Sequence, residues 1–170
     1  MDEFIGRSFI ARIRSVTPGL RGPICFSMRH EATKCGWLLR GGENMPAVPL
    51  RFDYLHHADD RIYYDICAAP ARHEYAGAKL GVSTNGYLGL YHHARVNDPW
   101  KIQLIGEGSL EQGFRFYLRD SYGQRVAVSS EEEQLGNQAN PHPGNLKRYD
   151  YLNVSYGQVI ELQAQVLEVL

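Results

Sequence analysis

Residues 85–98 bring together side chains of the types that hold a sugar. The Asn85-Gly86 pair predicts a tight hairpin turn, because both residues tolerate the positive φ that such a turn needs. Tyr87 and Tyr91 lie four positions apart, so they occupy the same face of the strand expected after the turn. An aromatic ring packs against the C–H face of a sugar, while amides and carboxylates hydrogen-bond its hydroxyls. The candidate ligand-binding residues are therefore Asn85, Tyr87, Tyr91, His93, Asn97 and Asp98.

No comparable pattern indicates catalysis. Ser83 and Ser129 carry hydroxyls, but neither stands in the Gly-x-Ser-x-Gly sequence of a nucleophile elbow. Asp53 and Asp150 could in principle belong to a carboxylate pair for glycoside hydrolysis. They recur within a repeated motif, however, which favours a structural role for both. We therefore predict no catalytic residues and no enzymatic activity.

Metal binding is not predicted either. The histidines occur as His56-His57 and His92-His93. Because adjacent residues of a strand point to opposite faces, each pair offers one outward imidazole rather than a chelate. The cysteines could form a metal site or one disulfide, but their odd number and their place in expected strands favour buried free thiols. They are Cys25, Cys35 and Cys67. No metal ion and no cofactor is expected.

These candidate residues depend on a framework in which one five-residue pattern recurs. Arg51–Leu55 returns almost unchanged as Arg148–Leu152, and Trp100–Leu104 lies between them, at spacings of 49 and 48 residues. A fixed period of this size is typical of a repeat architecture. The alternative is that any all-β chain contains short alternating runs. Both interpretations predict strands, since apolar and polar residues alternate in each copy.

Three units of about 45 residues, each with four short strands, resemble the β-trefoil. The segments 80–90 and 116–128 are similar to the strand–Gly-turn–strand repeats of fascin-type trefoils. The expected fold class is therefore an all-β β-trefoil with three pseudo-threefold repeats, in a single domain over residues 1–170. The repeats cover about 24–60, 61–112 and 113–158. The additional terminal strands at 8–15 and 159–168 are expected to pair with each other or to displace a weak strand such as 46–50.

The resemblance implies a binding protein. The leading hypothesis is a carbohydrate-binding, lectin-like module without catalytic activity. The alternative is a protein-interaction module, as in fascin-like or inhibitor-like trefoils, that uses the polar loop 136–147. Ricin-type lectins carry a Gln-x-Trp element, and neither Trp37 nor Trp100 has a glutamine two positions earlier. The sugar-binding residues of those lectins therefore cannot be transferred to this chain.

Composition sets the remaining limits. At 170 residues, with 44% hydrophobic and 22% charged residues, the chain fits one globular domain. A net charge of −1 gives no electrostatic reason for a nucleic-acid partner, and no apolar run reaches the roughly 20 residues of a membrane span. The segment Met1–Arg7 has acids where a signal peptide needs bases. We expect a cytoplasmic protein, or one exported without a cleaved signal peptide, whose partner is a glycan or a protein surface. The oligomeric state is not predicted.

Overall fold

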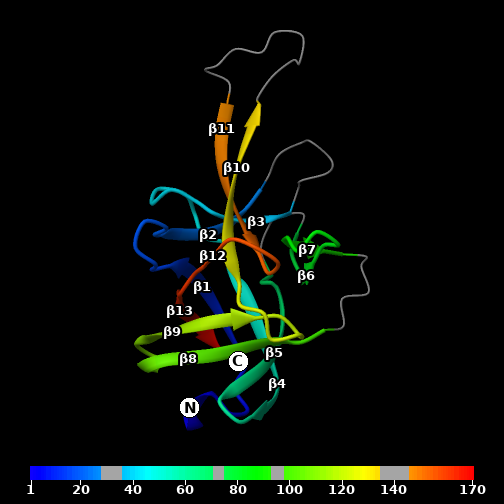
Figure 1. Ribbon diagram of the computed structural model, residues 1–170. Coiled ribbons are helices and arrows are strands. Elements are labelled where there is room, and N and C mark those ends of the chain that lie inside the picture. Colours follow the sequence, from blue (N-terminus) through cyan, green and yellow to red (C-terminus); the bar gives the residue numbers. More distant parts are fainter. Residues whose placement is uncertain (28–35, 71–74, 93–97, 135–145) are drawn as a thin grey trace.

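The fold is all-β in the part of the chain that the structure describes. The structure is a computed structural model, and it describes residues 1–27, 36–70, 75–92, 98–134 and 146–170 (Figure 1). A short 3-10 helix, η1 (Asp2–Phe4), precedes the strands. The strands are β1 (Phe9–Ser15), β2 (Gly22–Phe26), β3 (Leu38–Arg40), β4 (Leu50–Ala58), β5 (Arg61–Ala68), β6 (Lys79–Val82), β7 (Leu88–Tyr91), β8 (Trp100–Ser109), β9 (Gly113–Arg119), β10 (Ala127–Gln134), β11 (Leu146–Asn153), β12 (Gln158–Val159) and β13 (Leu162–Val169).

Six of these strands form a closed barrel. β1 pairs antiparallel with β13 and β4, and β4 pairs with β5. β5 then pairs with β8, β8 with β9, and β9 with β13, which completes the ring. Closure leaves no unpaired edge among the six strands, so none of them offers a template for pairing with another chain.

Three hairpins lie outside the ring, each between two consecutive barrel strands. They are β2–β3, β6–β7 and β10–β11, and the short β12 adds to β10. β11 pairs with β3, and the isolated bridges Trp37–Gly89 and Tyr87–Asn153 join β7 to the other two hairpins. Figure 1 shows the hairpins gathered at one end of the barrel, with β10 and β11 extending beyond it.

Alternating side chains fill the barrel. In β5 every second residue is buried, with Ile62, Tyr64, Ile66 and Ala68 inside. The Phe9 ring stacks on the Phe52 ring at 4.8 Å, and β1 and β4 are neighbours in the ring. Complete burial of side chains of this size is worth about 1.5–3 kcal/mol each. Burial of these alternate apolar side chains therefore favours closure of the strands into a barrel.

The three copies of the repeated motif do not occupy equivalent places. Arg51–Leu55 lies in β4 and Trp100–Leu104 in β8, both barrel strands, whereas Arg148–Leu152 lies in the hairpin strand β11. The third barrel strand in the same position of the chain order is β13. The strands expected at 8–15 and 159–168 do pair with each other, as β1 with β13. They are members of the barrel, however, and not additions to it.

A shared local interaction explains why β4 and β11 look alike in sequence. In each strand the arginine lies two positions before the aspartate, on the same face, and binds it. The Nε–Oδ1 distance is 2.8 Å for Arg51–Asp53 and 3.3 Å for Arg148–Asp150. Phe52 is buried beside the first pair, whereas Asp150 itself is buried in the second. The motif therefore indicates a strand with an ion pair, without fixing which face packs inward.

The expected hairpin turn at Asn85-Gly86 is confirmed, and its glycine is required by a close approach. Gly86 has φ 86°, and a Cβ atom at this position would lie 2.3 Å from Ser155 Oγ. The carbonyl of Gly86 also accepts a hydrogen bond from the Val154 amide at 2.9 Å. The turn of β6–β7 is thereby fixed against the segment that follows β11.

Gly86→Ala is expected to destabilise the protein by about 1–3 kcal/mol, because it adds backbone strain and a steric clash. Gly42→Ala is the matched control, since a Cβ atom there meets nothing within 4 Å and the backbone needs no positive φ. Urea denaturation of both variants measures the difference. Equal unfolding midpoints would show that the turn does not depend on its glycine.

Candidate functional site

A cleft of about 360 Å³ lies between the second hairpin and two neighbouring turns. One wall is formed by residues 80–84 and Gly86, at the tip of β6–β7. Residues 98–100, which lead into β8, and Val154-Ser155, which follow β11, form further parts of the lining. The turn after β9, with Asp120, Ser121, Tyr122 and Gln124, completes it. Segments far apart in sequence therefore meet here because the hairpins gather at one end of the barrel.

The floor of the cleft contains the buried Trp100. Trp100 is 3% exposed, and its indole Nε1 donates a hydrogen bond to the carbonyl oxygen of Leu80 at 3.0 Å. This bond satisfies the polar atom of a buried indole and joins β8 to β6. The floor is thus held by a side chain of the barrel rather than by the turns above it.

Tyr122 stands at the cleft with 88% of its surface exposed. A tight turn holds it there: the Gly123 amide donates to the Asp120 carbonyl at 3.0 Å, and the Gln124 amide donates to Asp120 Oδ1 at 2.8 Å. Asp120 is itself 6% exposed, so the turn is anchored by a buried carboxylate. The phenol ring is left with its faces open to solvent.

The polar lining of the cleft is rich in hydrogen-bond acceptors. Asp98 and Asp120 contribute carboxylates, and among the described residues they are the only charged ones of the lining. Hydroxyls come from Ser83, Thr84, Ser121 and Ser155. Carboxylates accept hydrogen bonds from ligand hydroxyls, while hydroxyl side chains both donate and accept. The described lining therefore offers hydrogen-bond donors and acceptors, and its charged groups are carboxylates.

Of the six residues predicted from the sequence, the cleft contains Asp98. Asn85 is exposed in the adjoining turn but does not line the cleft. Tyr87 is 7% exposed and stacks on Trp37 at 4.6 Å, and its phenol hydrogen-bonds to Glu131 and Tyr156. His93 and Asn97 lie outside the described residues.

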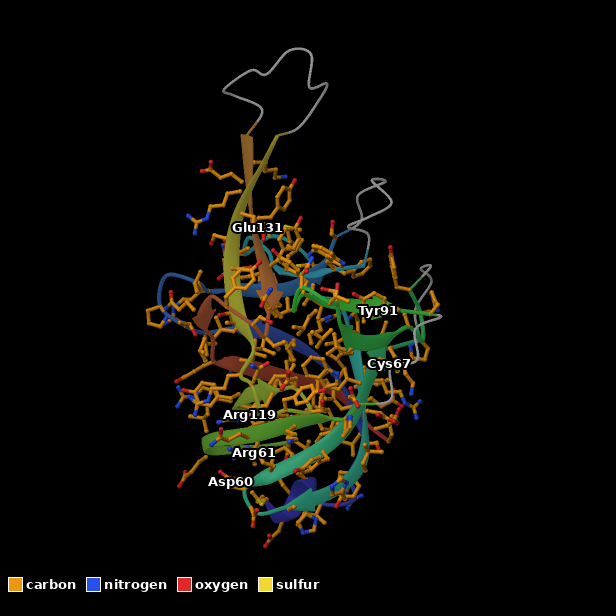
Figure 2. The ribbon with its side chains drawn as sticks, turned by 45° about the vertical axis from the view of Figure 1, so that its right-hand side comes forward. Asp60, Arg61, Cys67, Tyr91, Arg119 and Glu131 are labelled. Atoms are coloured by element: carbon orange, nitrogen blue, oxygen red, sulfur yellow. The ribbon has the colours of Figure 1, made fainter. Side chains whose placement is uncertain are left out.

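Tyr91 lies apart from the cleft as well. It is half-buried, and a Cβ atom at Gly89 would lie 3.0 Å from its ring and 3.2 Å from the Trp37 ring. Burial raises the pKa of Tyr91 above its ordinary value of 10.0. Figure 2 shows Tyr91 on the second hairpin and Glu131 on β10. Tyr87 and Tyr91 therefore share a strand face, as their spacing predicts, but this face packs against Trp37.

These tyrosines belong to an aromatic cluster that the sequence did not reveal. Tyr151, fully buried in β11, makes edge contacts with both Trp37 and Tyr87, and Tyr149 stacks on it at 5.8 Å. The cluster draws on all three hairpins, and no sequence spacing links its members. Its contacts hold the hairpins together at the end of the barrel.

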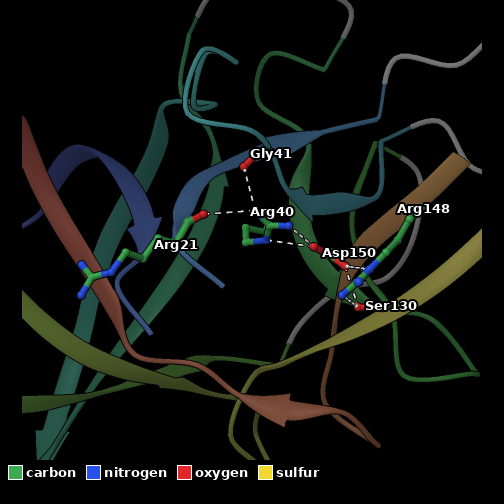
Figure 3. A network of polar contacts seen from close by, with 6 residues as sticks. All are labelled: Arg21, Arg40, Gly41, Ser130, Arg148 and Asp150. Carbon is green, nitrogen blue, oxygen red and sulfur yellow. Dashed lines mark hydrogen bonds and ion pairs between the residues drawn. The ribbon is translucent and has the colours of Figure 1, made fainter. Parts of the chain in front are cut away.

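A polar network fixes the third hairpin to the first on the other face of β11 (Figure 3). Asp150, 4% exposed, accepts hydrogen bonds from Ser130 Oγ at 2.6 Å and from Arg40 Nε at 3.0 Å. Burial opposes ionisation of Asp150, but these hydrogen bonds and the charges of Arg40 and Arg148 outweigh it, so its pKa is lowered from 3.8. The network is structural, since its carboxylate is enclosed.

Metal ligands are not clustered in the described ranges, where no group of three or more His, Cys, Asp and Glu side chains could hold an ion. Cys25 and Cys67 are free thiols, and Cys35 lies outside the described residues. No helix in the described part of the chain is long and apolar enough to cross a membrane. Of the loop 136–147, proposed above for a protein partner, residues up to 145 are likewise not described.

Comparisons with known proteins do not place the chain in a family. No protein-family model matches it, and the curated proteins give no match.

Proposed function

We propose that this protein is a carbohydrate-binding, lectin-like module without catalytic activity, and that the cleft beside the second hairpin is its binding site. The observation that carries the proposal is the 88% exposed ring of Tyr122 at a cleft that also contains the exposed carboxylate of Asp98. A sugar ring that stacks on Tyr122 would bring its hydroxyls toward the exposed carboxylate of Asp98, whereas Asp120 is buried and already accepts a hydrogen bond from the Gln124 amide. The hydroxyl side chains of the opposite wall offer further partners.

The charge of the lining narrows the ligand class. Since Asp98 and Asp120 are the charged residues of the lining in the part of the chain that the structure describes, an acidic sugar would bring like charges together, whereas a neutral sugar would not. A shallow site with one aromatic ring supports weak binding. We expect a millimolar dissociation constant, about −4 kcal/mol, for a neutral monosaccharide.

We also propose that the fold is a β-trefoil. The support is the chain order, in which a barrel strand, a hairpin and a second barrel strand follow one another three times. The units run from β1 to β4, from β5 to β8 and from β9 to β13. This division differs from the repeats expected from the sequence, because the first unit begins at β1 and the third ends at β13. The cleft then lies between the second and third units.

The test begins with a glycan array of the purified protein, followed by calorimetry with the best neutral sugar. Tyr122→Ala and Asp98→Asn should each weaken binding at least tenfold, about 1.4 kcal/mol, because one removes the stacking surface and the other a charged acceptor. Both residues are exposed, so the variants should stay folded.

Tyr91→Ala tests whether the sugar binds at the cleft or on the strand face shared by Tyr87 and Tyr91. If the cleft is the site, this variant should bind the sugar as the parent does. Loss of binding in Tyr91→Ala, with binding by Tyr122→Ala unaffected, would show that the sugar binds at the strand face of Tyr87 and Tyr91 and not at the cleft. A parent that binds no glycan, but captures a protein partner, would replace the proposal with the protein-interaction alternative.

A further inference from the structure

A second groove crosses the outer face of β9, and its lining differs in charge from that of the proposed sugar cleft. Its volume is about 410 Å³. The loop between β1 and β2 forms one side, and the segment around β12 forms the other. The lining residues with charged or aromatic side chains are Arg21, Arg115, Tyr117, Arg125 and Glu161. Three arginines and one glutamate give this lining a net charge of +2, in a chain whose net charge is −1.

The single carboxylate of the groove is already engaged. Arg115 Nη1 lies 3.6 Å from Glu161 Oε2, and the Tyr117 hydroxyl donates to Glu161 Oε1 at 3.3 Å. The Glu161 amide donates to Thr17 Oγ1 at 2.8 Å, which holds the two sides of the groove together. Glu161 therefore balances Arg115, and the other two arginines keep their charge.

Arg125 is positioned without being neutralised. Its guanidinium lies over the Tyr117 ring at 4.1 Å, a cation–π contact that fixes the group and leaves its N–H donors available. The backbone of Arg21 is fixed too, because its carbonyl accepts from Arg40 Nη1 at 3.1 Å. Within the described ranges no carboxylate lies within ion-pairing distance of the Arg21 or Arg125 side chain.

Neighbouring residues add to the positive field. Arg119 is bridged to Arg125 through the backbone, and burial together with the charges of Arg61 and Arg125 lowers the pKa of Arg119 below its ordinary value. Figure 2 shows Arg61, its partner Asp60 and Arg119 close together at the barrel end of the molecule.

We propose that this groove binds a doubly charged tetrahedral oxyanion, namely the phosphate or sulfate group of a small ligand. The guanidiniums of Arg21 and Arg125, which pair with no carboxylate of the described residues, match the charge of such a group, and the planar fork of each matches its oxygen geometry. The Thr17 hydroxyl can donate a further hydrogen bond. The site is independent of the sugar cleft, whose lining carries the opposite charge.

The probes are inorganic phosphate, inorganic sulfate and glucose 6-phosphate, with glucose as the uncharged reference. Titration at low ionic strength, followed by calorimetry or amide NMR, should give binding of at least one oxyanion. Raising the salt concentration should weaken that binding, since the attraction is electrostatic. Tighter binding of glucose 6-phosphate than of phosphate supports an esterified ligand, and equal binding supports the free oxyanion as the ligand.

Arg21→Gln and Arg125→Gln should each weaken oxyanion binding at least tenfold. Arg12→Gln is the matched control, because Arg12 is an exposed arginine of β1 that lines a different groove. It should bind as the parent does. The proposal is overturned if the parent binds none of the three oxyanions, or if all three variants bind them equally.

Discussion

Trp100→Ala is expected to lower the free energy of unfolding by about 3–5 kcal/mol, as truncation of a buried aromatic residue does. Trp100 is 3% exposed and lies opposite Tyr64 in the pairing of β8 with β5. The substitution opens a cavity at the barrel wall and leaves the Leu80 carbonyl without its indole donor. Urea denaturation, with the slope checked for two-state behaviour, measures the loss.

Tyr122→Ala is the control for this prediction, because it removes an aromatic ring that is 88% exposed. Its stability should stay within about 0.5 kcal/mol of the parent. A loss below about 1 kcal/mol for Trp100→Ala would mean that the tryptophan contributes little to the core.

Asp150→Asn is expected to cost about 3 kcal/mol at neutral pH, because it removes one partner of a buried ion pair and leaves Arg40 uncompensated. Asp53→Asn is the matched control. Asp53 stands in the same Arg-x-Asp pattern of β4, but its side chain is 38% exposed and its pair is screened by water. A smaller change is therefore expected for Asp53→Asn, and equal losses would contradict the structural role of the network.

The cost of Asp150→Asn should depend on pH. The pKa of Asp150 is lowered in the folded protein from its ordinary value of 3.8. Ionised Asp150 therefore stabilises the fold above about pH 4, and this contribution is lost as the pH falls through the lower, folded-state pKa. Unfolding at pH 7 and at pH 3 should show a wide gap between parent and Asp150→Asn that narrows in acid. A gap that widens in acid would reverse the sign of the shift.

The strands themselves could be predicted from the sequence, whereas their places in the fold could not. Alternation marks β1, β4 and β5 directly, and the Asn85-Gly86 pair marks the turn of β6–β7. The pairing of β1 with β13 is expected from the sequence, but only as an addition outside the repeats, and no local pattern indicates that these two strands close the barrel. The motif shared by β4 and β11 does not predict which residues are buried. Its second position is buried in β4, as Phe52, whereas its third position is buried in β11, as Asp150.

Of the residues that line the proposed cleft, the sequence predicts only Asp98 as a ligand-binding residue. Tyr122 carries no periodic signal, because an exposed tyrosine in a turn looks like any surface residue until the neighbouring wall is known. Tyr87 suited the prediction by spacing, but the bridge between Trp37 and Gly89 brings a tryptophan against its strand face. Tertiary packing brings together Trp37, Tyr87 and Tyr151 from the three hairpins, and no spacing in the sequence predicts these contacts.

The most direct test of the account is an amide NMR titration of the protein with a neutral sugar selected on the glycan array. Progressive shifts should concentrate at Thr84, Asp98, Ser121 and Tyr122, around the cleft. The same titration of Tyr122→Ala should need at least tenfold more sugar to shift the resonances of Thr84, Asp98 and Ser121 to the same extent. Shifts that gather instead around Trp37 and Tyr156, or that persist unchanged in Tyr122→Ala, would contradict the assignment of the cleft as a sugar-binding site.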